Sequence, residues 1–549
     1  MGQKKELALL CAVAAASLAI FINKAFCADD PLFLWGAARI REHPLDAYGL
    51  SINWYGTWQP LWQATHNPPL ASYLIALVAS LFGASEVVLH AAFVLPAVGV
   101  VVGAWYLCRL AGIRSRLVAA FVTLASPGFL ASSTNVMCDT LMVCFSVWSV
   151  ALWIDGLRLS KPSRLAAASI LVAAAALTKY FALSLWPLLV ACTIVVDRRR
   201  WRAVLWLLVP SAIFATYECW TRALYGTVHV LHASFIAVGV ERGGSLLNKT
   251  IVALSFTGAS FLPIVFFLPF IASKRFLALT AFFALAIAVY FKEVAWQPGL
   301  AEIGYHHQMT WAAAAQLALF ITGGALVIAL ALVEGRHLRS DPISTVLALW
   351  ILGTYVFAGY VNWGCNVRSV LPMAPAIGVL VARRIGRCGT ARFAALALVP
   401  AGLVALAVAY ADFNWANSAR ELANSVAETS AGKRLWFEGH WGFQCYLQKR
   451  GGREVDFLDP QWEVGDLIAV PEDNADTRAV PEEYARLVTT VTVPSPWPPI
   501  SIMSRPTGAG FYSAFFGPMP FVFEAPPPQR CLVLMATKPG ANLVKDAIR

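Results

Sequence analysis

The sequence predicts a polytopic α-helical membrane protein with a smaller soluble domain at its C-terminal end. Of its 549 residues, 58% are hydrophobic and only 13% are charged, whereas ordinary soluble domains carry about 25% charged residues. Apolar runs of about 17–25 residues, long enough to cross a bilayer as a helix, recur along the chain. After residue 411 polar residues and prolines become frequent, so the remainder is predicted to be one small α/β domain outside the bilayer.

About thirteen segments are predicted to span the membrane. They lie near 6–26, 86–108, 117–132, 137–154, 165–178, 181–197, 202–222, 250–272, 276–291, 311–333, 342–361, 369–382 and 393–411. The apolar stretch 68–83 is shorter and is predicted to lie on, or re-enter, the outer face. With that arrangement, 20 Lys and Arg residues before residue 411 lie on the inner side and 9 on the outer side. A span at 68–83 would instead move most clusters of Lys and Arg to the outer side, against the tendency of basic residues to stay inside.

Two domains are therefore expected. Residues 1–411 form a transmembrane domain whose first outer loop, 27–85, carries amphipathic juxtamembrane helices, and residues 412–549 form a C-terminal α/β domain on the same outer side. The expected location is the bacterial inner (plasma) membrane, crossed many times, with the C-terminal domain periplasmic. Cys445 and Cys531 could form a disulfide if this domain is extracytoplasmic, and the sequence leaves open whether they are bridged. The net charge of +11 does not indicate nucleic-acid binding, because the basic residues follow the pattern of topology signals.

Acidic residues gather at the outer ends of two predicted spans. Asp29 and Asp30 directly follow the first span in CADDPLFLWGAARIR, and Asp139 begins the fourth span. Ionised carboxylates at a membrane boundary are costly unless paired or hydrated, which favours a functional role. Taken alone, each is more simply read as a helix cap or a plain helix exit. Together they could serve as a general base and its partner, or Asp30 and Asp139 could bind a divalent cation.

Basic residues on the same face could hold a phosphate. Lys179 lies between two apolar runs, Arg368 precedes a late span, and His66 begins HNPPL. Each alone is more often an anchor or an ordinary loop residue, but Arg has the geometry that suits phosphate. Two cations and three carboxylates on one face favour a site that handles a phosphate and a hydroxyl. Because nucleotide-binding motifs are absent, a lipid-borne donor is favoured over a soluble nucleotide.

Two alternative functions are weighed. A lipid or polysaccharide transporter predicts ionisable residues near span centres and related halves, whereas the predicted spans carry few charges inside them. A non-catalytic cell-envelope assembly protein predicts that the outer acids and cations do not converge.

The order of the motifs resembles that of the GT-C fold glycosyltransferases that use polyprenyl-phosphate sugars, including protein O-mannosyltransferases and lipid A aminoarabinose transferases. ADDPLFLWGAARI is similar to the acidic pair and juxtamembrane helix of that group, NPPLASYL to its second juxtamembrane helix, and CDTLMVCF to the Asp of its fourth span. LTKY and NVRSVLPMAP are similar to its Lys and Arg segments. The likeness covers roughly residues 5–410. Asp30 stands where the group usually has Glu, and Asn67 where it commonly has Lys or His.

The resemblance implies a membrane glycosyltransferase, with residues 1–411 as its GT-C-like catalytic domain. Such an enzyme moves a sugar from a polyprenyl-phosphate carrier to an acceptor hydroxyl by an inverting single displacement on the periplasmic face. Asp29 would deprotonate the acceptor, and Asp139 would orient it or bind a cation. Lys179, Arg368 and His66 would bind the donor phosphate. The implied partners are this donor, the lipid bilayer, and a glycan, lipid or protein acceptor, with lipopolysaccharide among the candidates. A divalent cation is the only cofactor considered.

Overall fold

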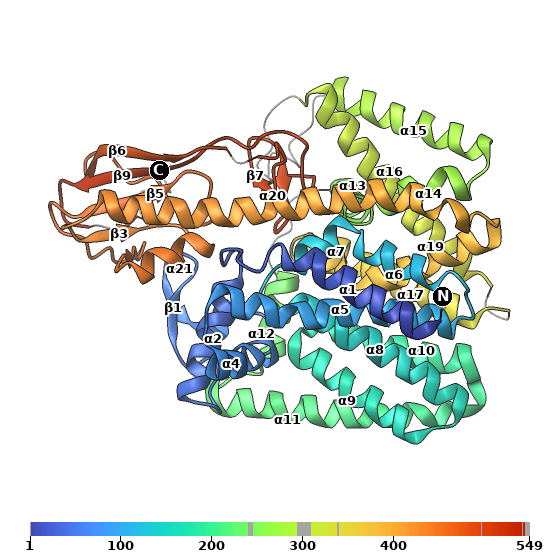
Figure 1. Ribbon diagram of the computed structural model, residues 1–549. Coiled ribbons are helices and arrows are strands. Elements are labelled where there is room, and N and C mark those ends of the chain that lie inside the picture. Colours follow the sequence, from blue (N-terminus) through green and yellow to red (C-terminus); the bar gives the residue numbers. More distant parts are fainter. Residues whose placement is uncertain are drawn as a thin grey trace.

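The computed structural model describes residues 2–239, 245–293, 309–337, 340–495, 497–540 and 542–543. Long helices run side by side to form a bundle, and a domain that contains a β-sheet extends from one end of it (Figure 1). The N-terminus lies at the opposite end of the bundle. This architecture confirms the predicted fold class.

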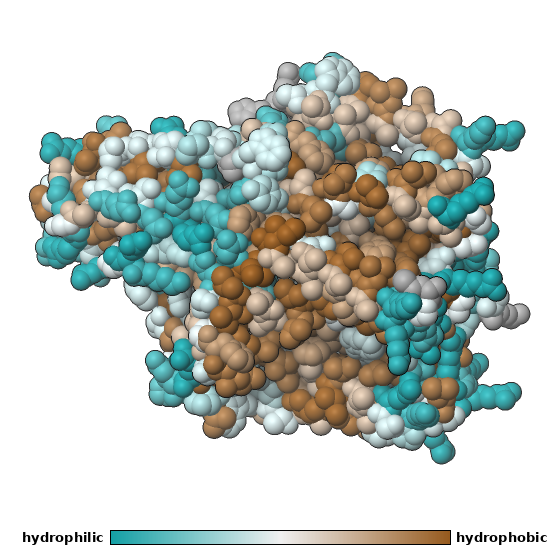
Figure 2. Space-filling view, viewed as in Figure 1, coloured by the Kyte–Doolittle hydropathy of each residue, from teal (hydrophilic) through white to brown (hydrophobic). Residues whose placement is uncertain are grey.

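The surface of the bundle is apolar in a broad belt. Figure 2 shows hydrophobic residues over the bundle and hydrophilic residues over the C-terminal domain and over the opposite end. Large apolar side chains such as Leu95, Phe282 and Leu403 are exposed in the helical part. In a bilayer these side chains are favourable because they contact lipid, and the helices satisfy their own backbone polar groups. The chain is therefore a membrane protein.

The bundle contains most of the helices. They are α1 (Gln3–Ala19), α5 (Glu86–Leu110), α6 (Arg116–Leu124), α7 (Pro127–Ser132), α8 (Cys138–Leu159), α9 (Pro162–Thr178), α10 (Leu185–Asp197), α11 (Leu208–Tyr225), α12 (His229–Gly239), α13 (Leu246–Ser260), α14 (Pro263–Ile271), α15 (Lys274–Glu293), α16 (Trp311–Gly335), α17 (Pro342–Val356), α18 (Val367–Val370), α19 (Ala374–Cys388) and α20 (Ala394–Thr429). Short 3-10 or π segments adjoin them at η1 (Tyr180–Ser184), η2 (Arg198–Leu207), η3 (Phe357–Val361), η4 (Leu371–Met373) and η5 (Ala391–Phe393).

Fewer helices than predicted have the length of a full span. Within the described residues, eight are long and apolar enough to cross a membrane, or nine if the bent pair α13 and α14 forms one span. The count of thirteen is not confirmed, because several predicted spans are short or interrupted. Helices α1 and α9 have 17 residues each, and the predicted span 117–132 is divided between α6 and α7. Proline at the start of α7 favours this break, because it cannot continue a preceding helix.

The first outer loop lies at the end of the bundle that carries the C-terminal domain (Figure 1). Its elements are α2 (Asp30–Glu42), β1 (Ser51–Asn53), β2 (Trp58–Pro60), α3 (Leu61–Ala64) and α4 (Leu70–Phe82). Helices α2 and α4 pack against each other, which confirms both predicted juxtamembrane helices. With 13 residues, α4 is about 20 Å long, so it is shorter than the ~30 Å hydrocarbon core.

Helices α13 and α16 approach closely where both carry glycine. A Cβ atom at Gly258 would lie 1.8 Å from the Phe320 carbonyl oxygen, and one at Gly324 would lie 2.1 Å from the Leu254 carbonyl oxygen. Small residues allow this contact, as is common between membrane helices.

We expect Gly258→Ala to destabilise the protein by about 1–3 kcal/mol, because the added methyl group forces the two backbones apart. Thermal unfolding of the purified protein in detergent measures the effect. Gly402→Ala is the matched control, since Gly402 lies in α20 with no atom near its missing Cβ and the change there raises helix propensity. Equal melting temperatures for the two variants would contradict the expectation.

The C-terminal domain has a five-stranded sheet in the order β4-β3-β5-β9-β6. Its elements, with a separate two-stranded ribbon of β7 and β8, are β3 (Leu435–Phe437), α21 (Trp441–Lys449), β4 (Arg453–Glu454), β5 (Leu467–Pro471), β6 (Ala485–Val493), β7 (Met503–Ser504), β8 (Ala509–Gly510) and β9 (Gln529–Ala536). Strands β4, β3 and β5 are parallel, and β9 is antiparallel to β5 and β6. Side chains alternate between two cores: Leu435 and Phe437 face α20 and α21, whereas Trp436 faces the other side.

One continuous helix joins the bundle to the C-terminal domain. Helix α20 has 36 residues, so the predicted domain boundary at 411/412 lies within it. The segment between β6 and β9 also returns to the bundle, since Phe511 and Met519 belong to the core of the membrane domain. The two domains are thus linked by a helix and by a packed loop.

Cys445 and Cys531, which the sequence left open as a possible disulfide, are both free. Cys445 on α21 packs with the core of the bundle, and Cys531 on β9 packs inside the sheet domain. The two thiols therefore belong to different cores, and each behaves as a small buried apolar residue.

Candidate functional site

Asp29 and Arg368 form an ion pair at the end of the bundle that carries the C-terminal domain. Asp29 caps α2 without using its side chain for the cap, and its Oδ2 lies 2.6 Å from Arg368 Nη1. Arg368 lies in the short helix α18, whose start is held by the C-terminal domain: Val367 N donates to Phe511 O, and Ala514 N donates to Cys365 O. The Nε atom of Arg368 is buried and has no hydrogen-bond partner, so this guanidinium keeps one donor free for a ligand.

Asp139 and Lys179 form a second ion pair. Asp139 lies in the first turn of α8, where a carboxylate is favoured by the helix dipole. Its Oδ1 is 2.5 Å from Lys179 Nζ, and Lys179 directly follows the last residue of α9. The other oxygen, Oδ2, is buried and has no partner. This pair therefore keeps one acceptor free.

The two ion pairs are neighbours. Arg368 Nη1 donates to the Met137 sulfur at 3.3 Å, and Met137 directly precedes α8, whose first turn holds Asp139. The charges of Asp29 and Asp139 both act on Arg368. Four of the predicted residues are thus brought together: Asp139 in α8, Arg368 in α18, Asp29 directly before α2 and Lys179 directly after α9.

Asp30 lies beside this site but is enclosed. Its side chain is fully buried; Oδ2 accepts from Cys27 N at 2.8 Å and Oδ1 accepts from Val136 N at 3.0 Å. Burial is the main cause that raises the pKa of Asp30 to about 7, although both amides favour the charged form. This geometry suits a side chain that ties the first outer loop to the start of α8.

His66 lies farther along the first outer loop, near two other histidines. Its ring is 6.2 Å from that of His232, centroid to centroid. Burial lowers the pKa of His66 to about 4, with His232 and His229 adding to the effect, while the charge of Asp29 opposes it. His66 is therefore neutral at pH 7, and its buried Nε2 has no partner. Within the described ranges, no group of three or more His, Cys, Asp or Glu side chains could hold a metal ion.

A fully buried polar network, which the sequence did not predict, adjoins the Asp29–Arg368 pair. Lys24 Nζ lies 2.5 Å from Asp412 Oδ2, and both side chains are 0% exposed. Tyr512, from the C-terminal domain, donates to Asp412 at 2.9 Å and contacts Asn135. The Tyr512 ring also lies 5.6 Å from the Arg368 guanidinium carbon. The only sequence signal was that Lys24 and Asp412 lie at the outer ends of the first and last spans.

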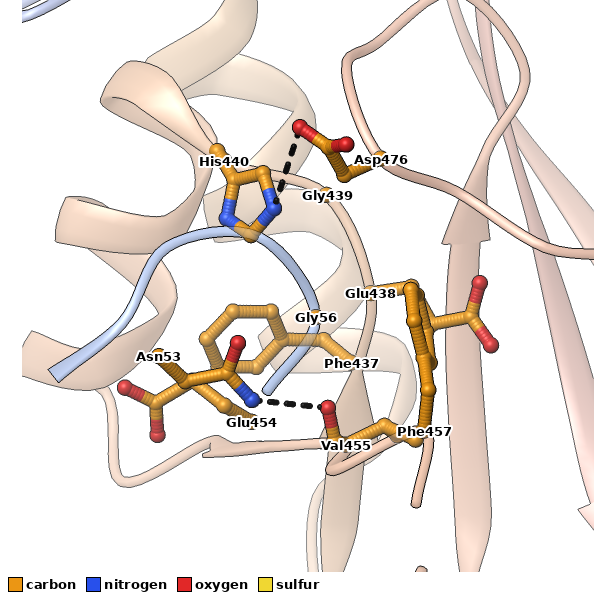
Figure 3. Close-up of a pocket in the computed structure, with 10 residues that line it drawn as sticks. All are labelled: Asn53, Gly56, Phe437, Glu438, Gly439, His440, Glu454, Val455, Phe457 and Asp476. Carbon is orange, nitrogen blue, oxygen red and sulfur yellow. Dashed lines mark hydrogen bonds and ion pairs between the residues drawn. The ribbon is translucent and has the colours of Figure 1, made fainter. Parts of the chain in front are cut away.

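A polar pocket lies in the C-terminal domain, against the hairpin of the first outer loop (Figure 3). Glu438 follows β3 and is buried; its Oε2 accepts from Arg478 N at 2.7 Å. Burial raises the pKa of Glu438 to about 8, so its carboxyl group is mostly protonated at neutral pH.

We expect Glu438→Gln to change how stability depends on pH. Folding raises the pKa of Glu438 from 4.5 to about 8, so the folded wild type binds an extra proton between these values and loses stability as pH rises through that window. Glutamine does not ionise, so the variant should gain up to about 3 kcal/mol over wild type at pH 7 and little at pH 4.5. Thermal unfolding across this range measures the difference, with Glu472→Gln as the control. Parallel curves for wild type and Glu438→Gln would contradict this expectation.

Part of the chain matches a known protein family. The family model described as dolichyl-phosphate-mannose-protein mannosyltransferase matches residues 66–220, a segment that contains His66, Asp139 and Lys179. Comparison with curated protein sequences gives no match.

Several solved structures are similar. ArnT from Cupriavidus metallidurans, bound to undecaprenyl phosphate, is 16% identical, with a TM-score of 0.48 over 86% of this chain and 94% of its own. The oligosaccharyltransferase of Archaeoglobus fulgidus in its apo form is 14% identical, with a TM-score of 0.51 over 82% of this chain and 64% of its own. The same enzyme tethered to an acceptor peptide is 13% identical, with a TM-score of 0.50 over the same shares. The matched region is thus less than two thirds of the oligosaccharyltransferase.

The fold comparison and the family model agree with the order of the sequence motifs. They confirm that this membrane protein has the GT-C glycosyltransferase fold.

Proposed function

We propose that the protein transfers a sugar from a polyprenyl-phosphate carrier to an acceptor hydroxyl at the site formed by Asp29, Asp139, Lys179 and Arg368. The observation that carries this proposal is the adjacency of two ion pairs that each keep one polar atom free. Arg368 Nε is a free donor and Asp139 Oδ2 a free acceptor, which matches the needs of a phosphate and a hydroxyl. The family model that covers residues 66–220 is named after a donor of this lipid class.

Donor binding would activate Asp29 by exchanging ion pairs. Without donor, Arg368 holds an oxygen of the Asp29 carboxylate at 2.6 Å, so this oxygen is already engaged and is not available to an acceptor hydroxyl. A donor phosphate competes for Arg368, because guanidinium binds phosphate oxygens well. Asp29 is then released to accept a proton. Lys179 would likewise turn from Asp139 to the phosphate.

The reaction is a single displacement. The acceptor oxygen forms a bond to the anomeric carbon while Asp29 takes the hydroxyl proton. The bond from the anomeric carbon to the phosphate oxygen breaks, and its electron pair leaves with the polyprenyl phosphate. Arg368 and Lys179 stabilise the developing negative charge, so no general acid is required. Attack opposite the leaving group inverts the anomeric centre.

We assign the remaining predicted residues to supporting roles. Asp139 Oδ2 orients the acceptor hydroxyl, Asp30 holds the loop that carries Asp29, and His66 offers its free Nε2 to the donor head group. If a divalent cation takes part, Asp139 is the better ligand, because both oxygens of Asp30 already accept backbone hydrogen bonds. The site and the C-terminal domain would face the periplasm of a bacterial inner membrane, as the distribution of basic residues favours.

Transfer of radiolabelled sugar from polyprenyl phosphate to a cell-envelope fraction, catalysed by the purified protein in lipid nanodiscs, tests this proposal. Product should be sensitive to Asp29→Asn. Transport of the intact donor across liposomes without transfer would instead support a transporter. The 80° bend between α13 and α14 is the feature that favours this second candidate, since transporters often use broken helices.

A further inference from the structure

A segment of the C-terminal domain lies against the start of α18. Between β8 and β9 the chain returns to the bundle, where Val367 N donates to Phe511 O at 3.1 Å and Ala514 N donates to Cys365 O at 3.0 Å. These two hydrogen bonds lie on either side of Tyr512 in the sequence. The backbone that carries Tyr512 is therefore fixed beside α18, the short helix of the proposed site.

The hydroxyl group of Tyr512 is held by buried polar groups. It donates to the Asp412 carboxylate, whose two oxygens both lie at 2.9 Å, and it accepts from Asn135 Nδ2 at 2.9 Å. Asp412 is in turn paired with Lys24, and all four side chains are buried. Hydrogen bonds to a charged acceptor are strong, and burial strengthens them further. The network therefore fixes where the phenol ring lies.

The ring of Tyr512 has two close neighbours. Trp415 stacks on it with the ring centroids 5.5 Å apart, and the guanidinium carbon of Arg368 lies over it, 5.6 Å from the ring centroid. An aromatic face attracts a guanidinium cation, and the attraction grows when both groups are withdrawn from water. Tyr512 is only 4% exposed and the side chain of Arg368 13%. Arg368 thus has two attractive partners, the Asp29 carboxylate and the Tyr512 ring.

The ring becomes important when Arg368 changes its ionic partner. In the proposed function, a donor phosphate competes with Asp29 for this guanidinium. The ring attracts the cation without neutralising its charge, so the N–H donors remain available to the phosphate. Tyr512 would therefore hold Arg368 in place while its ion pair passes from Asp29 to the donor.

We propose that Tyr512 is a positioning residue, through which the C-terminal domain holds Arg368 ready for the donor phosphate. The inference rests on the proposed function and adds to it a residue of the C-terminal domain that takes part in donor binding. The competing explanation is a purely structural role, in which Tyr512 only fastens the two domains together.

Two substitutions separate the ring from the hydroxyl group. Tyr512→Phe keeps the ring over Arg368 and removes the hydrogen bonds to Asp412 and Asn135, whereas Tyr512→Leu removes both, so both variants should lose stability. Donor binding should instead follow the ring. We expect Tyr512→Leu to weaken the binding of polyprenyl phosphate about fivefold, and Tyr512→Phe to change it by less than about twofold. Tyr512→Met, which also fills space without a ring, replaces Tyr512→Leu if that variant does not fold.

Binding is measured without catalysis, by titrating the full-length protein in detergent with a fluorescent short-chain polyprenyl phosphate. Tyr446 in α21 offers the matched control. Its hydroxyl group also donates to a carboxylate, that of Glu86, and its ring centroid lies 5.9 Å from the guanidinium carbon of Arg420, outside the proposed site. Tyr446→Leu should therefore lower the melting temperature and leave the binding of polyprenyl phosphate unchanged.

The outcomes separate this inference from the proposed function. If wild type binds polyprenyl phosphate and Tyr512→Leu binds it equally well, or if Tyr512→Phe weakens binding as much as Tyr512→Leu, the inference is overturned and the proposed function stands. If wild type binds the lipid but transfers no sugar, the proposed function fails and the binding data alone decide the inference. If wild type does not bind the lipid, both fail.

Kinetics supply a second readout where transfer is detected. Tyr512→Leu should raise the KM for the donor about fivefold and leave the KM for the acceptor unchanged, because the ring acts only on the residue that binds the donor phosphate. Tyr512→Phe should restore the donor KM to nearly the wild-type value. A donor KM that is unchanged in Tyr512→Leu, or raised equally in both variants, would contradict the positioning role.

Discussion

Asp29→Asn is expected to lower kcat by about 10²–10⁴-fold, the range attributed to a positioned general base. Asparagine is nearly isosteric and can still accept a hydrogen bond from Arg368, so the fold and the donor site should persist. The KM for the donor should therefore change little. Initial rates of transfer from radiolabelled polyprenyl-phosphate sugar, with purified protein in nanodiscs, give both constants.

Asp46→Asn is the matched control for this experiment. Asp46 lies in the same outer loop and pairs with Arg39 at 2.6 Å, the distance that separates Asp29 from Arg368. Loss of an Asp–Arg pair of this kind should by itself cost about 0–1 kcal/mol, because both partners are partly exposed. Activity close to wild type in Asp29→Asn, or equal losses in both variants, would remove the assignment of Asp29 as the base.

Lys24→Met is expected to destabilise the protein by about 3–5 kcal/mol, because it leaves the buried carboxylate of Asp412 without its cation. Both side chains are 0% exposed, so water cannot replace the lost partner. Transfer activity should fall with stability, since Tyr512 contacts both Asp412 and Arg368. Thermal unfolding in detergent and the yield of folded protein measure the effect.

A second substitution separates the loss of the charge pair from the loss of packing. Lys24→Met combined with Asp412→Leu removes both charges, and apolar replacement of a whole buried pair is often neutral or stabilising. The double variant should therefore be more stable than Lys24→Met alone. Lys161→Met, at an exposed loop residue, is the control and should change stability by less than about 0.5 kcal/mol. A double variant no more stable than the single one would show that packing, not charge, explains the loss.

The sequence predicted the fold class because membrane spans and amphipathic helices leave local signals. Apolar runs predicted the bundle, and Pro31 and the PPL motif marked the starts of α2 and α4. The number of spans was less predictable, because tertiary contacts decide whether an apolar run is one straight helix or a bent pair such as α13 and α14. A hydropathy profile shows how apolar a segment is, but it does not show whether the helix bends.

The site was predictable only as a set of residues on one face. The predicted topology placed Asp29, Asp139, Lys179 and Arg368 at the same end of the bundle. It did not predict which acid pairs with which cation. The Lys24–Asp412–Tyr512 network was not predicted, because its members are separated by up to several hundred residues. In the sequence, Lys24 and Asp412 resemble ordinary residues at the ends of spans, and Tyr512 resembles an ordinary residue of the C-terminal domain. Whether Cys445 and Cys531 are bridged could not be decided from the sequence, since cysteine spacing carries no information about which core each thiol faces.

Helix α20 has a mechanical consequence. Its 36 residues make a rod of about 54 Å, fixed part-way along its length where Asp412 meets Lys24. A small tilt of the end of α20 that lies in the C-terminal domain would therefore shift Tyr512 beside Arg368. Crowding or tethering of the C-terminal domain would thereby act on the ion pair between Arg368 and Asp29, without a ligand having to reach the bundle.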